Sequence, residues 1–247
     1  MIDHKYIGFV SNKVNFKDND AIINVITPEG KKTFKARGIA KITSKNAKSC
    51  NYFMISEFLC NSKSEVSNQS LKSASLIKMY KKPYDDLLVS ACYLWICNLL
   101  DNLSNEINGY DLAINCFDKL EEDVYPLDIL NYFLKNLCNS LGYQSNLNGC
   151  VYCNKKNELI SFDFESGGFI CVNCFNATQH EKMTTSYLKD VYNFLKEDEL
   201  LLIKQHNSIK LLNQYIKFLK EVVGISTKCF DFAIKCIWGE QIWKKDY

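Results

Sequence analysis

The sequence lacks the motifs that carry several common kinds of catalysis. It contains no G-x4-G-K-[ST] phosphate-binding loop, which argues against an ATPase of that type. It also lacks the H-E-x-x-H and G-x-S-x-G signatures of zinc metalloproteases and serine hydrolases. The three histidines, His4, His180 and His206, are scattered, and the acidic runs Asp85-Asp86 and Glu121 to Asp123 are typical of helix starts or solvated loops. We therefore predict that the protein is not an enzyme.

The chain also lacks a long hydrophobic run. Its most apolar stretch, from Leu87 to Leu100, is only fourteen residues long and contains Ser90 and Asn98. A membrane-spanning helix needs about 20 apolar residues, so we expect no membrane segment and no membrane partner. The first residues lead into a short strand-like run and do not resemble a secretory signal peptide. These absences predict a cytoplasmic protein.

Cysteine, in contrast, is abundant, with twelve in 247 residues. Without a secretion signal this number favours a reducing compartment, where disulfides are rare. Eight of the cysteines lie mostly among apolar residues, and we expect them to behave as small buried apolar side chains. These eight are Cys50, Cys60, Cys92, Cys97, Cys116, Cys138, Cys229 and Cys236.

The other four cysteines form a C-x2-C-x17-C-x2-C array: Cys150 and Cys153, then Cys171 and Cys174. Each C-x2-C turn directs two sulfurs at one point, and two facing turns make a tetrahedral site with metal–sulfur distances near ~2.3 Å. Four thiolates select zinc over hard cations, and four protein ligands leave no open position for catalysis. The array predicts one structural Zn²⁺ per chain. The alternative is four unrelated core thiols.

The residues between the two pairs support a zinc ribbon, which we place at about residues 146–180. Residues 159–164 are typical of a strand, Gly167-Gly168 of a turn, and Phe169-Ile170 of the returning strand. Asn154 follows the first cysteine pair, where a residue that tolerates left-handed backbone geometry is useful. His180 lies six residues beyond Cys174 and is a possible further donor, but we favour a surface histidine.

Charge is distributed unevenly along the chain. Residues 1–78 carry twelve lysines and one arginine against six acidic residues, a formal net charge of +7. Residues 79–247 carry seventeen lysines against twenty-two acidic residues, a net charge of −5. This asymmetry favours a polyanionic partner for the first part alone.

The first part of the sequence predicts five short strands. They cover residues 6–10, 21–27, 31–37, 52–58 and 71–80, with a turn at Pro28-Glu29-Gly30. Five short strands in about 75 residues suit a small closed barrel of the OB type. We therefore predict an OB-fold nucleic-acid-binding domain at residues 1–80.

The end of the third predicted strand and the loop after it hold a run of cations with no acidic residue. Seven basic residues lie between Lys31 and Lys48, and an unopposed run on a barrel favours a nucleic-acid contact over a merely solvated face. The predicted DNA-binding residues are Lys31, Lys32, Lys35, Arg37, Lys41, Lys45 and Lys48. Phe9, Phe16 and Phe34 are candidates for base stacking, although each is also a plausible core residue.

Residues 81–247 predict a helical domain that contains the ribbon. Pro83 and Asp85 precede an apolar helix over residues 87–99, and a weaker helix is expected over residues 110–120. Pro126 and Gly142 bracket an apolar stripe over residues 127–141. Further helices are expected over residues 186–196, 208–223 and 227–244. The fold class is thus α+β and multidomain, with an N-terminal OB-fold barrel, an α-helical body and an inserted four-cysteine zinc ribbon.

Several of these motifs, in this order, resemble the RecO family of bacterial recombination mediators. The segment from Ile26 to Gly30, followed by residues 34–39 and by Ser44-Lys45, resembles the family's "T-x-x-G … A-[KR]-G … S-[KR]" run. Phe9-Val10 with residues 16–20 resembles its opening strand and turn, and the C-x2-C … G-G-F-I-C-x2-C ribbon resembles that of its zinc-bearing members. The resemblance covers nearly the whole chain.

The resemblance implies a function in DNA repair and homologous recombination. Members of the family bind single- and double-stranded DNA, anneal complementary strands and act with RecR. They also bind the acidic tail of single-stranded DNA-binding protein and so help RecA load on coated strands. It also implies a cytoplasmic, nucleoid-associated protein. For the tail, the candidate surface is the set of lysines Lys217, Lys220, Lys228 and Lys235.

The sequence leaves two other functional classes open. A zinc ribbon beside an OB domain also occurs in DNA ligases and other nucleic-acid enzymes, but the K-x-D-G motif of a ligase is absent. A zinc-ribbon transcription or translation factor would also be basic and non-catalytic.

Overall fold

The computed structural model describes residues 2–62, 69–103 and 109–224. The described residues divide into two compact units, one that ends at Glu122 and one that begins at Asp123. Each unit is described here by itself. None of the helices in the described ranges is long and apolar enough to cross a membrane.

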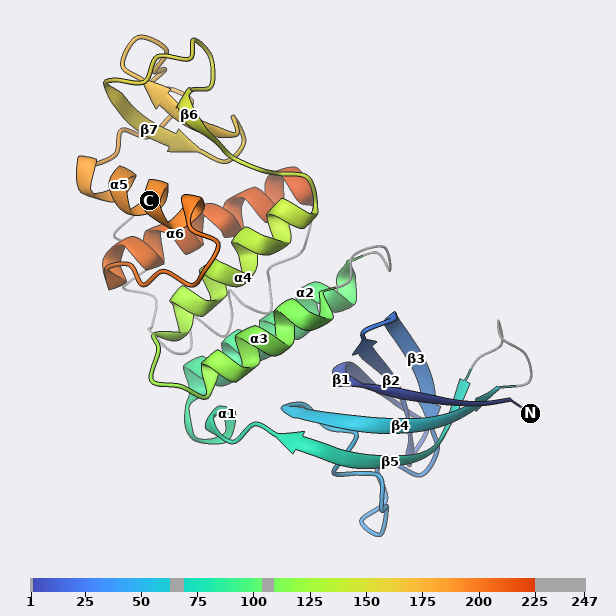
Figure 1. Cartoon of the computed structure of the whole chain (residues 1–247). Helices are drawn as coiled ribbons and strands as arrows, with labels where there is room; N and C mark the ends of the chain where they lie inside the picture. The colour runs from blue at the N-terminus through green and yellow to red at the C-terminus, as the bar shows by residue number, and fades with distance from the viewer. Residues whose placement is uncertain (1, 63–68, 104–108, 225–247) are drawn as a thin grey trace. The chain divides into compact units, whose positions relative to one another are not determined.

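Five strands of the first unit form a closed barrel in the order β1-β2-β3-β5-β4 (Figure 1). Strand β1 closes the barrel because it is long enough for two partners: Ile2 to Phe9 pair with β4, and Phe9 to Phe16 pair with β2. A register shift between Val10 and Asn12 marks the change of partner. The strands are β1 (Ile2–Phe16), β2 (Asp20–Thr27), β3 (Gly30–Ala36), β4 (Met54–Ser62) and β5 (Gln69–Met79).

The interior of the barrel is apolar because alternate residues of each strand point inward. Ile23 and Val25 of β2, Phe34 of β3 and Phe58 of β4 have no exposed surface. The predicted OB-type fold is confirmed.

Three helices follow in the same unit: α1 (Lys82–Asp85), α2 (Leu87–Asn102) and α3 (Tyr110–Leu120). Asp86 caps α2, since its carboxylate accepts hydrogen bonds from the backbone N–H groups of Leu88 (2.8 Å) and Val89 (3.1 Å). As its composition predicts, α2 is largely buried, although Leu87 is 66% exposed.

An aromatic cluster joins these helices to the barrel. The rings of Tyr93 on α2 and Phe117 on α3 are stacked with centroids 3.7 Å apart. Phe9 of β1 meets Phe117 edge to face at 5.0 Å, and Phe53, just before β4, meets Tyr93 edge to face at 4.9 Å. Large aromatic side chains contribute strongly to core stability, so helices and barrel share one core.

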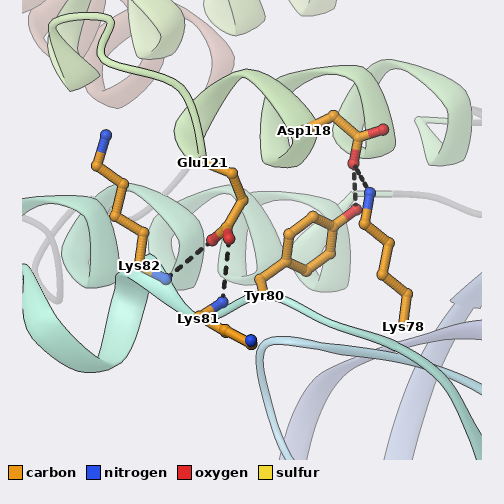
Figure 2. Close-up of polar contacts among 6 residues, drawn as sticks. All are labelled: Lys78, Tyr80, Lys81, Lys82, Asp118 and Glu121. Carbon is orange, nitrogen blue, oxygen red and sulfur yellow. Dashed lines mark hydrogen bonds and ion pairs between the residues drawn. The ribbon is translucent and has the colours of Figure 1, made fainter.

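Polar contacts reinforce this junction, as Figure 2 shows. Asp118 of α3 accepts hydrogen bonds from Lys78 Nζ (2.6 Å) and from the hydroxyl of Tyr80 (2.7 Å). Burial, and then the hydrogen bond to Asp118, raise the pKa of Tyr80, so its hydroxyl stays protonated and donates. Glu121 accepts from the backbone N–H groups of Lys81 (3.2 Å) and Lys82 (2.9 Å). These bonds explain why α3 belongs to the first unit. The division into an OB domain at residues 1–80 and a helical domain at residues 81–247 stays a prediction.

The second unit combines helices with a small three-stranded sheet in the order β6-β8-β7. Gly224 ends the last helical segment with a positive φ of 76°, a common position for glycine after a helix. The elements are α4 (Pro126–Ser140), β6 (Asn146–Cys150), β7 (Leu159–Asp163), β8 (Gly168–Cys171), α5 (Thr185–Lys196), α6 (Gln205–Phe218) and a π-helical turn (Leu219–Val223).

The fold class predicted from the sequence is therefore confirmed: an N-terminal barrel, a helical body and an inserted ribbon with four cysteines. Six of the eight other cysteines are buried, which confirms that they behave as small apolar side chains. Burial raises the pKa of these thiols, to about 12 for Cys50 and Cys138. The helix predicted over residues 227–244, with Lys228, Cys229, Lys235 and Cys236, lies outside the described residues.

Candidate metal centre and nucleic-acid interface

The structure brings the four ribbon cysteines together. The sulfurs of Cys150, Cys153, Cys171 and Cys174 all lie within 4.8 Å of one another. Cys153 Sγ and Cys171 Sγ are 3.6 Å apart, far beyond a disulfide bond of ~2.05 Å. A tetrahedral site with metal–sulfur distances of ~2.3 Å has sulfur–sulfur edges of about 3.8 Å. The spacing of the group therefore fits a single metal ion.

Local backbone geometry makes the first cysteine turn. The N–H of Asn154 donates to the carbonyl of Cys150 at 2.8 Å, and Asn154 has the left-handed φ of 60° expected at this position. The N–H of Cys150 donates to the carbonyl of Lys155 at 2.9 Å, which fixes the end of β6. In the second turn, the N–H of Cys174 donates to the carbonyl of Cys171 at 3.1 Å.

The electrostatics of the cluster favour a bound cation. Burial acts to raise the pKa of Cys150, but hydrogen bonds from backbone groups of Cys171, Tyr152 and Cys153 outweigh it and lower the pKa to about 6. The pKa of Cys174 is raised to about 12, first by its hydrogen bond with Cys153 and then by burial. Four sulfurs this close cannot all ionise unless a positive charge lies between them. The donor set is soft, which fits zinc better than calcium or magnesium.

His180 is not part of this group. Its Nδ1 accepts a hydrogen bond from the N–H of Asn176 at 3.1 Å, and its ring lies 6.0 Å from the rings of both Tyr152 and Phe175. The side chain is only 9% exposed, so the prediction of a surface histidine is wrong. The reason is local: the N–H of His180 also bonds to the carbonyl of Asn176, and this turn folds the ring back under the ribbon.

The basic loop between β3 and β4 is an ordered structure. Its backbone bonds to the β1–β2 turn, through the N–H of Gly38 to the carboxylate of Asp20 (2.8 Å) and the N–H of Ala40 to the carbonyl of Asn19 (3.1 Å). Ile39 and Cys50 are buried and anchor its two ends in the barrel core. The loop therefore holds its exposed cations in place.

Five of the seven predicted DNA contacts keep their charge free. Lys35 is half-buried on β3, and Arg37, Lys41, Lys45 and Lys48 are exposed. Within the described residues none of these five forms an ion pair. The ion pairs of the first unit instead join β1, β4, β5 and α3: Lys5–Glu57 (2.8 Å), Lys72–Asp3 (2.6 Å) and Lys78–Asp118 (2.6 Å).

The other two predicted contacts are engaged inside the fold. Lys31 Nζ donates to the backbone carbonyl of Asp101 at 2.6 Å, near the C-terminal end of α2, where the helix dipole favours a cation. Lys32 Nζ lies 5.4 Å from the centre of the Tyr6 ring. The ammonium group of Lys31 is therefore less available to a phosphate than those of the loop, whereas Lys32, like Lys35, makes a cation–π contact.

Asp101 is a residue that the sequence analysis missed. Its carboxylate accepts hydrogen bonds from Ser11 (3.0 Å), Asn12 (3.2 Å) and Asn24 (2.9 Å), which lie on β1 and β2. Asp101 thus ties the end of α2 to the barrel. No sequence signal could have found it, because its partners are up to 90 residues away.

The three candidate stacking aromatics have different environments. Phe9 and Phe34 have no exposed surface, so they are core residues. Phe16, at the end of β1, is 39% exposed. It is the member of the three that a ligand can reach.

Of the lysines considered for an acidic tail, Lys217 lies in acidic surroundings, and Lys228 and Lys235 lie outside the described residues. Lys217 pairs with Glu221 at 3.8 Å and lines a groove with Asp163, Glu165 and Glu181. Lys220 is exposed. The carboxylates of this groove oppose the binding of an acidic segment.

A barrel whose loop cations form no ion pair among the described residues, joined to helices and a four-cysteine ribbon, is typical of OB-fold proteins of the nucleic-acid-binding class. The comparison with known families is more specific. Residues 1–80 match the N-terminal domain of Recombination protein O, and residues 84–224 match its C-terminal domain. The chain therefore belongs to the RecO family, which confirms the resemblance seen in the sequence and supports a role in DNA repair and recombination.

Several curated proteins named DNA repair protein RecO are similar along much of the chain. The Mesoplasma florum protein is 29% identical over 73% of this chain and 70% of its own length. The Mycoplasma mycoides subsp. mycoides protein is 24% identical over 89% and 92%. The Listeria monocytogenes serotype 4a protein is 22% identical over 97% of both. A solved aspartyl tRNA synthetase from Entamoeba histolytica aligns over 96% of this chain and 56% of its own with 7% identity and a TM-score of 0.23, too low to indicate a shared fold.

Proposed function

We propose that the protein is a non-enzymatic recombination mediator that binds single- and double-stranded DNA through its barrel and anneals complementary strands. The observation that carries the proposal is a set of cations on β3 and the ordered loop after it, Lys35, Arg37, Lys41, Lys45 and Lys48, which have no ion-pair partners among the described residues. Family membership points to the same role.

Annealing requires that two mutually repelling phosphate backbones be held close together. Cations on the loop neutralise phosphates and release counterions, so the affinity should fall steeply as salt rises. Lysine acts as a point charge and does not read base edges, so binding should be largely independent of sequence. Neutralisation of about four phosphates predicts a log–log salt slope near −3 for single strands, from roughly −0.7 per phosphate.

The metal in this proposal is one Zn²⁺, held by Cys150, Cys153, Cys171 and Cys174. The close approach of the four sulfurs and their soft donor chemistry support zinc. With four protein ligands the ion would stabilise the ribbon and take no part in a reaction.

The proposed partners are RecR, the acidic tail of single-stranded DNA-binding protein and, indirectly, RecA, in the bacterial cytoplasm at the nucleoid. For the tail, we favour a groove of about 590 Å³ between the ribbon and α5. Its lining includes the apolar Leu159, Phe169 and Leu188 together with Lys156 and Lys189, and it contains no acidic residue. A groove of this kind suits an acidic peptide better than the acid-lined groove beside Lys217.

The test combines metal analysis with strand annealing by the full-length protein. We expect one zinc per chain and annealing of complementary oligonucleotides that needs no nucleotide and weakens between about 50 and 200 mM salt. DNA binding without annealing would favour a ribbon-bearing transcription or translation factor. Failure to bind DNA would refute the proposal.

A further inference from the structure

One exposed aromatic ring lies among free cations at the edge of the DNA face. Phe16 is 39% exposed at the end of β1, whereas Phe9 and Phe34 are fully buried. Phe9 packs against Phe117 and Phe34 against Phe58, with ring centroids 5.0 and 5.9 Å apart. The core therefore uses the other two rings and leaves that of Phe16 at the surface.

Two lysines flank the Phe16 ring. Lys35 Nζ lies 4.7 Å from its centre and Lys17 Nζ lies 5.6 Å away, both within the range of a cation–π contact. Neither lysine forms an ion pair in the part of the chain that the structure describes. Because both ammonium groups lie over the ring, a base that stacks on the ring takes the place of one of them, and the displaced ammonium group stays close enough to pair with a phosphate of the same strand.

The surface beside Phe16 also exposes apolar side chains next to a lysine. Val14 is 56% exposed and faces Ile22, 39% exposed, across the β1–β2 pair, and Ile22 in turn faces Lys35 across the β2–β3 pair. An apolar strip thus runs from Phe16 along the outside of the barrel with a cation at its border. Such a strip can take the faces of unpaired bases, which are apolar, whereas in duplex DNA the base faces are stacked on one another and are not accessible.

The acidic residues near this strip leave the ring open. Asp20 is the cross-strand partner of Phe16, but its carboxylate accepts the N–H of Gly38 at 2.8 Å and is held toward the basic loop. Asp18 lies in the exposed turn between β1 and β2. A phosphate beside the ring is therefore better placed near Lys35 than near the turn.

We infer that Phe16 is a specificity-determining residue, which stacks an unpaired base and makes the DNA face prefer single strands to duplex. This inference rests on the proposed DNA binding and adds to it a single aromatic contact. Stacking depends on the ring and the lysines on charge, so the two contributions can be separated by their dependence on salt.

The test compares Phe16→Ala and Phe16→Trp with the wild type in the full-length protein. The probes are a fluorescein-labelled oligothymidine strand and a labelled duplex of equal length, each titrated at several salt concentrations. For Phe16→Ala we expect the affinity for the single strand to fall about fivefold to a hundredfold, with an unchanged salt slope. The affinity for duplex should change by less than about twofold, and Phe16→Trp should keep single-strand binding. Ile77→Ala, which removes an exposed apolar side chain from β5, outside the strip, is the matched control and should leave the affinity for both probes unchanged.

The experiment distinguishes failure of the proposed DNA binding from failure of the stacking inference. If the wild type binds neither probe, the proposed function fails and the inference with it. If the wild type binds but Phe16→Ala weakens both probes equally, or weakens neither, the inference alone is wrong. A melting temperature of Phe16→Ala close to that of the wild type shows that the variant is folded.

Discussion

The two compact units of this protein are stabilised in different ways and expose different chemistry. The first has an aromatic core shared by the barrel and α1–α3, and it leaves several cations free. The second carries a sheet whose strands are only four or five residues long, held together around four cysteines. Sheets this small rarely have enough core to be stable alone. From this difference we predict that DNA contacts belong to the first unit and metal-dependent stability to the second.

Removal of the metal should have the largest effect, and only in the second unit. Structural zinc contributes on the order of 10 kcal/mol to the folding of small domains. We therefore expect Cys171→Ser, or treatment with a chelator, to unfold the ribbon and to abolish the zinc content. Thermal unfolding followed by near-ultraviolet circular dichroism measures this loss.

The DNA affinity of the same variant tests whether the two units have separate roles. It should stay within about threefold of the wild type, because counterion release by the first unit is unchanged. Cys138→Ala removes a buried cysteine of the second unit that lies outside the cluster, and this control should keep its zinc. If loss of the metal abolished DNA binding while the barrel stayed folded, the division of roles would be wrong.

The reciprocal change removes cations from the first unit. We expect the triple variant Lys35→Ala, Arg37→Ala, Lys41→Ala to lose about a hundredfold in single-strand affinity at ~0.1 M salt, since each lost phosphate contact costs about fivefold. The three side chains form no ion pair within the described residues, so the melting temperature should change little. Fluorescence anisotropy and calorimetry measure the two quantities, and a large loss of stability without loss of affinity would contradict the assignment.

The sequence predicts a structural element well when the pattern that specifies it lies within that element. Cysteine spacing located the four-cysteine cluster, and apolar patterns located most strands and helices. Strand β6 was missed because its residues, Asn-Leu-Asn-Gly-Cys, contain no β-branched or aromatic side chain. Strand β1 is longer than predicted because its polar second half, up to Phe16, is specified by pairing with β2.

The details of the candidate site were less predictable, because they depend on contacts between distant residues. The sequence grouped Lys31 with the free cations, but α2 places the carbonyl of Asp101 next to it, 70 residues further along the chain. Phe9, Phe16 and Phe34 were equivalent in the sequence, and packing alone separates the exposed ring from the buried ones.

A smaller effect is expected from Asp101→Ala in the first unit. The change leaves Ser11, Asn12 and Asn24 without the carboxylate that accepts their hydrogen bonds, which should cost about 1–3 kcal/mol of stability. Urea unfolding measures the loss. Asp111→Ala, which removes an exposed carboxylate from α3, should cost less than about 0.5 kcal/mol. Equal effects of the two changes would show that the contacts of Asp101 do not stabilise the unit.

A further effect concerns the pH dependence of the second unit. Burial raises the pKa of Asp128 to about 6 from its ordinary 3.8, despite hydrogen bonds from Ser208 and the backbone of Ile203. The folded state thus holds a proton that the unfolded state has lost, and stability should fall as pH rises from about 4 to 6 and then level off. Urea unfolding at several pH values measures this decline in the free energy of unfolding. Asp128→Asn should remove the decline between about pH 4 and 6, whereas Asp198→Asn, at an exposed position, should leave it unchanged. If the decline were the same in Asp128→Asn, groups other than Asp128 would be its cause.

The most direct test of the central claim compares two variants that each lose two positive charges from the first unit. Lys35→Ala with Lys41→Ala removes free cations, and Lys5→Ala with Lys72→Ala removes cations that pair with Glu57 and Asp3. The measurement is the log–log salt slope of single-strand binding by the full-length, zinc-loaded protein. We predict that the first variant reduces the slope by about 1.4, from roughly 0.7 per phosphate, and that the second leaves it unchanged. Equal slopes in the two variants would contradict the assignment of DNA binding to the free cations of the basic loop.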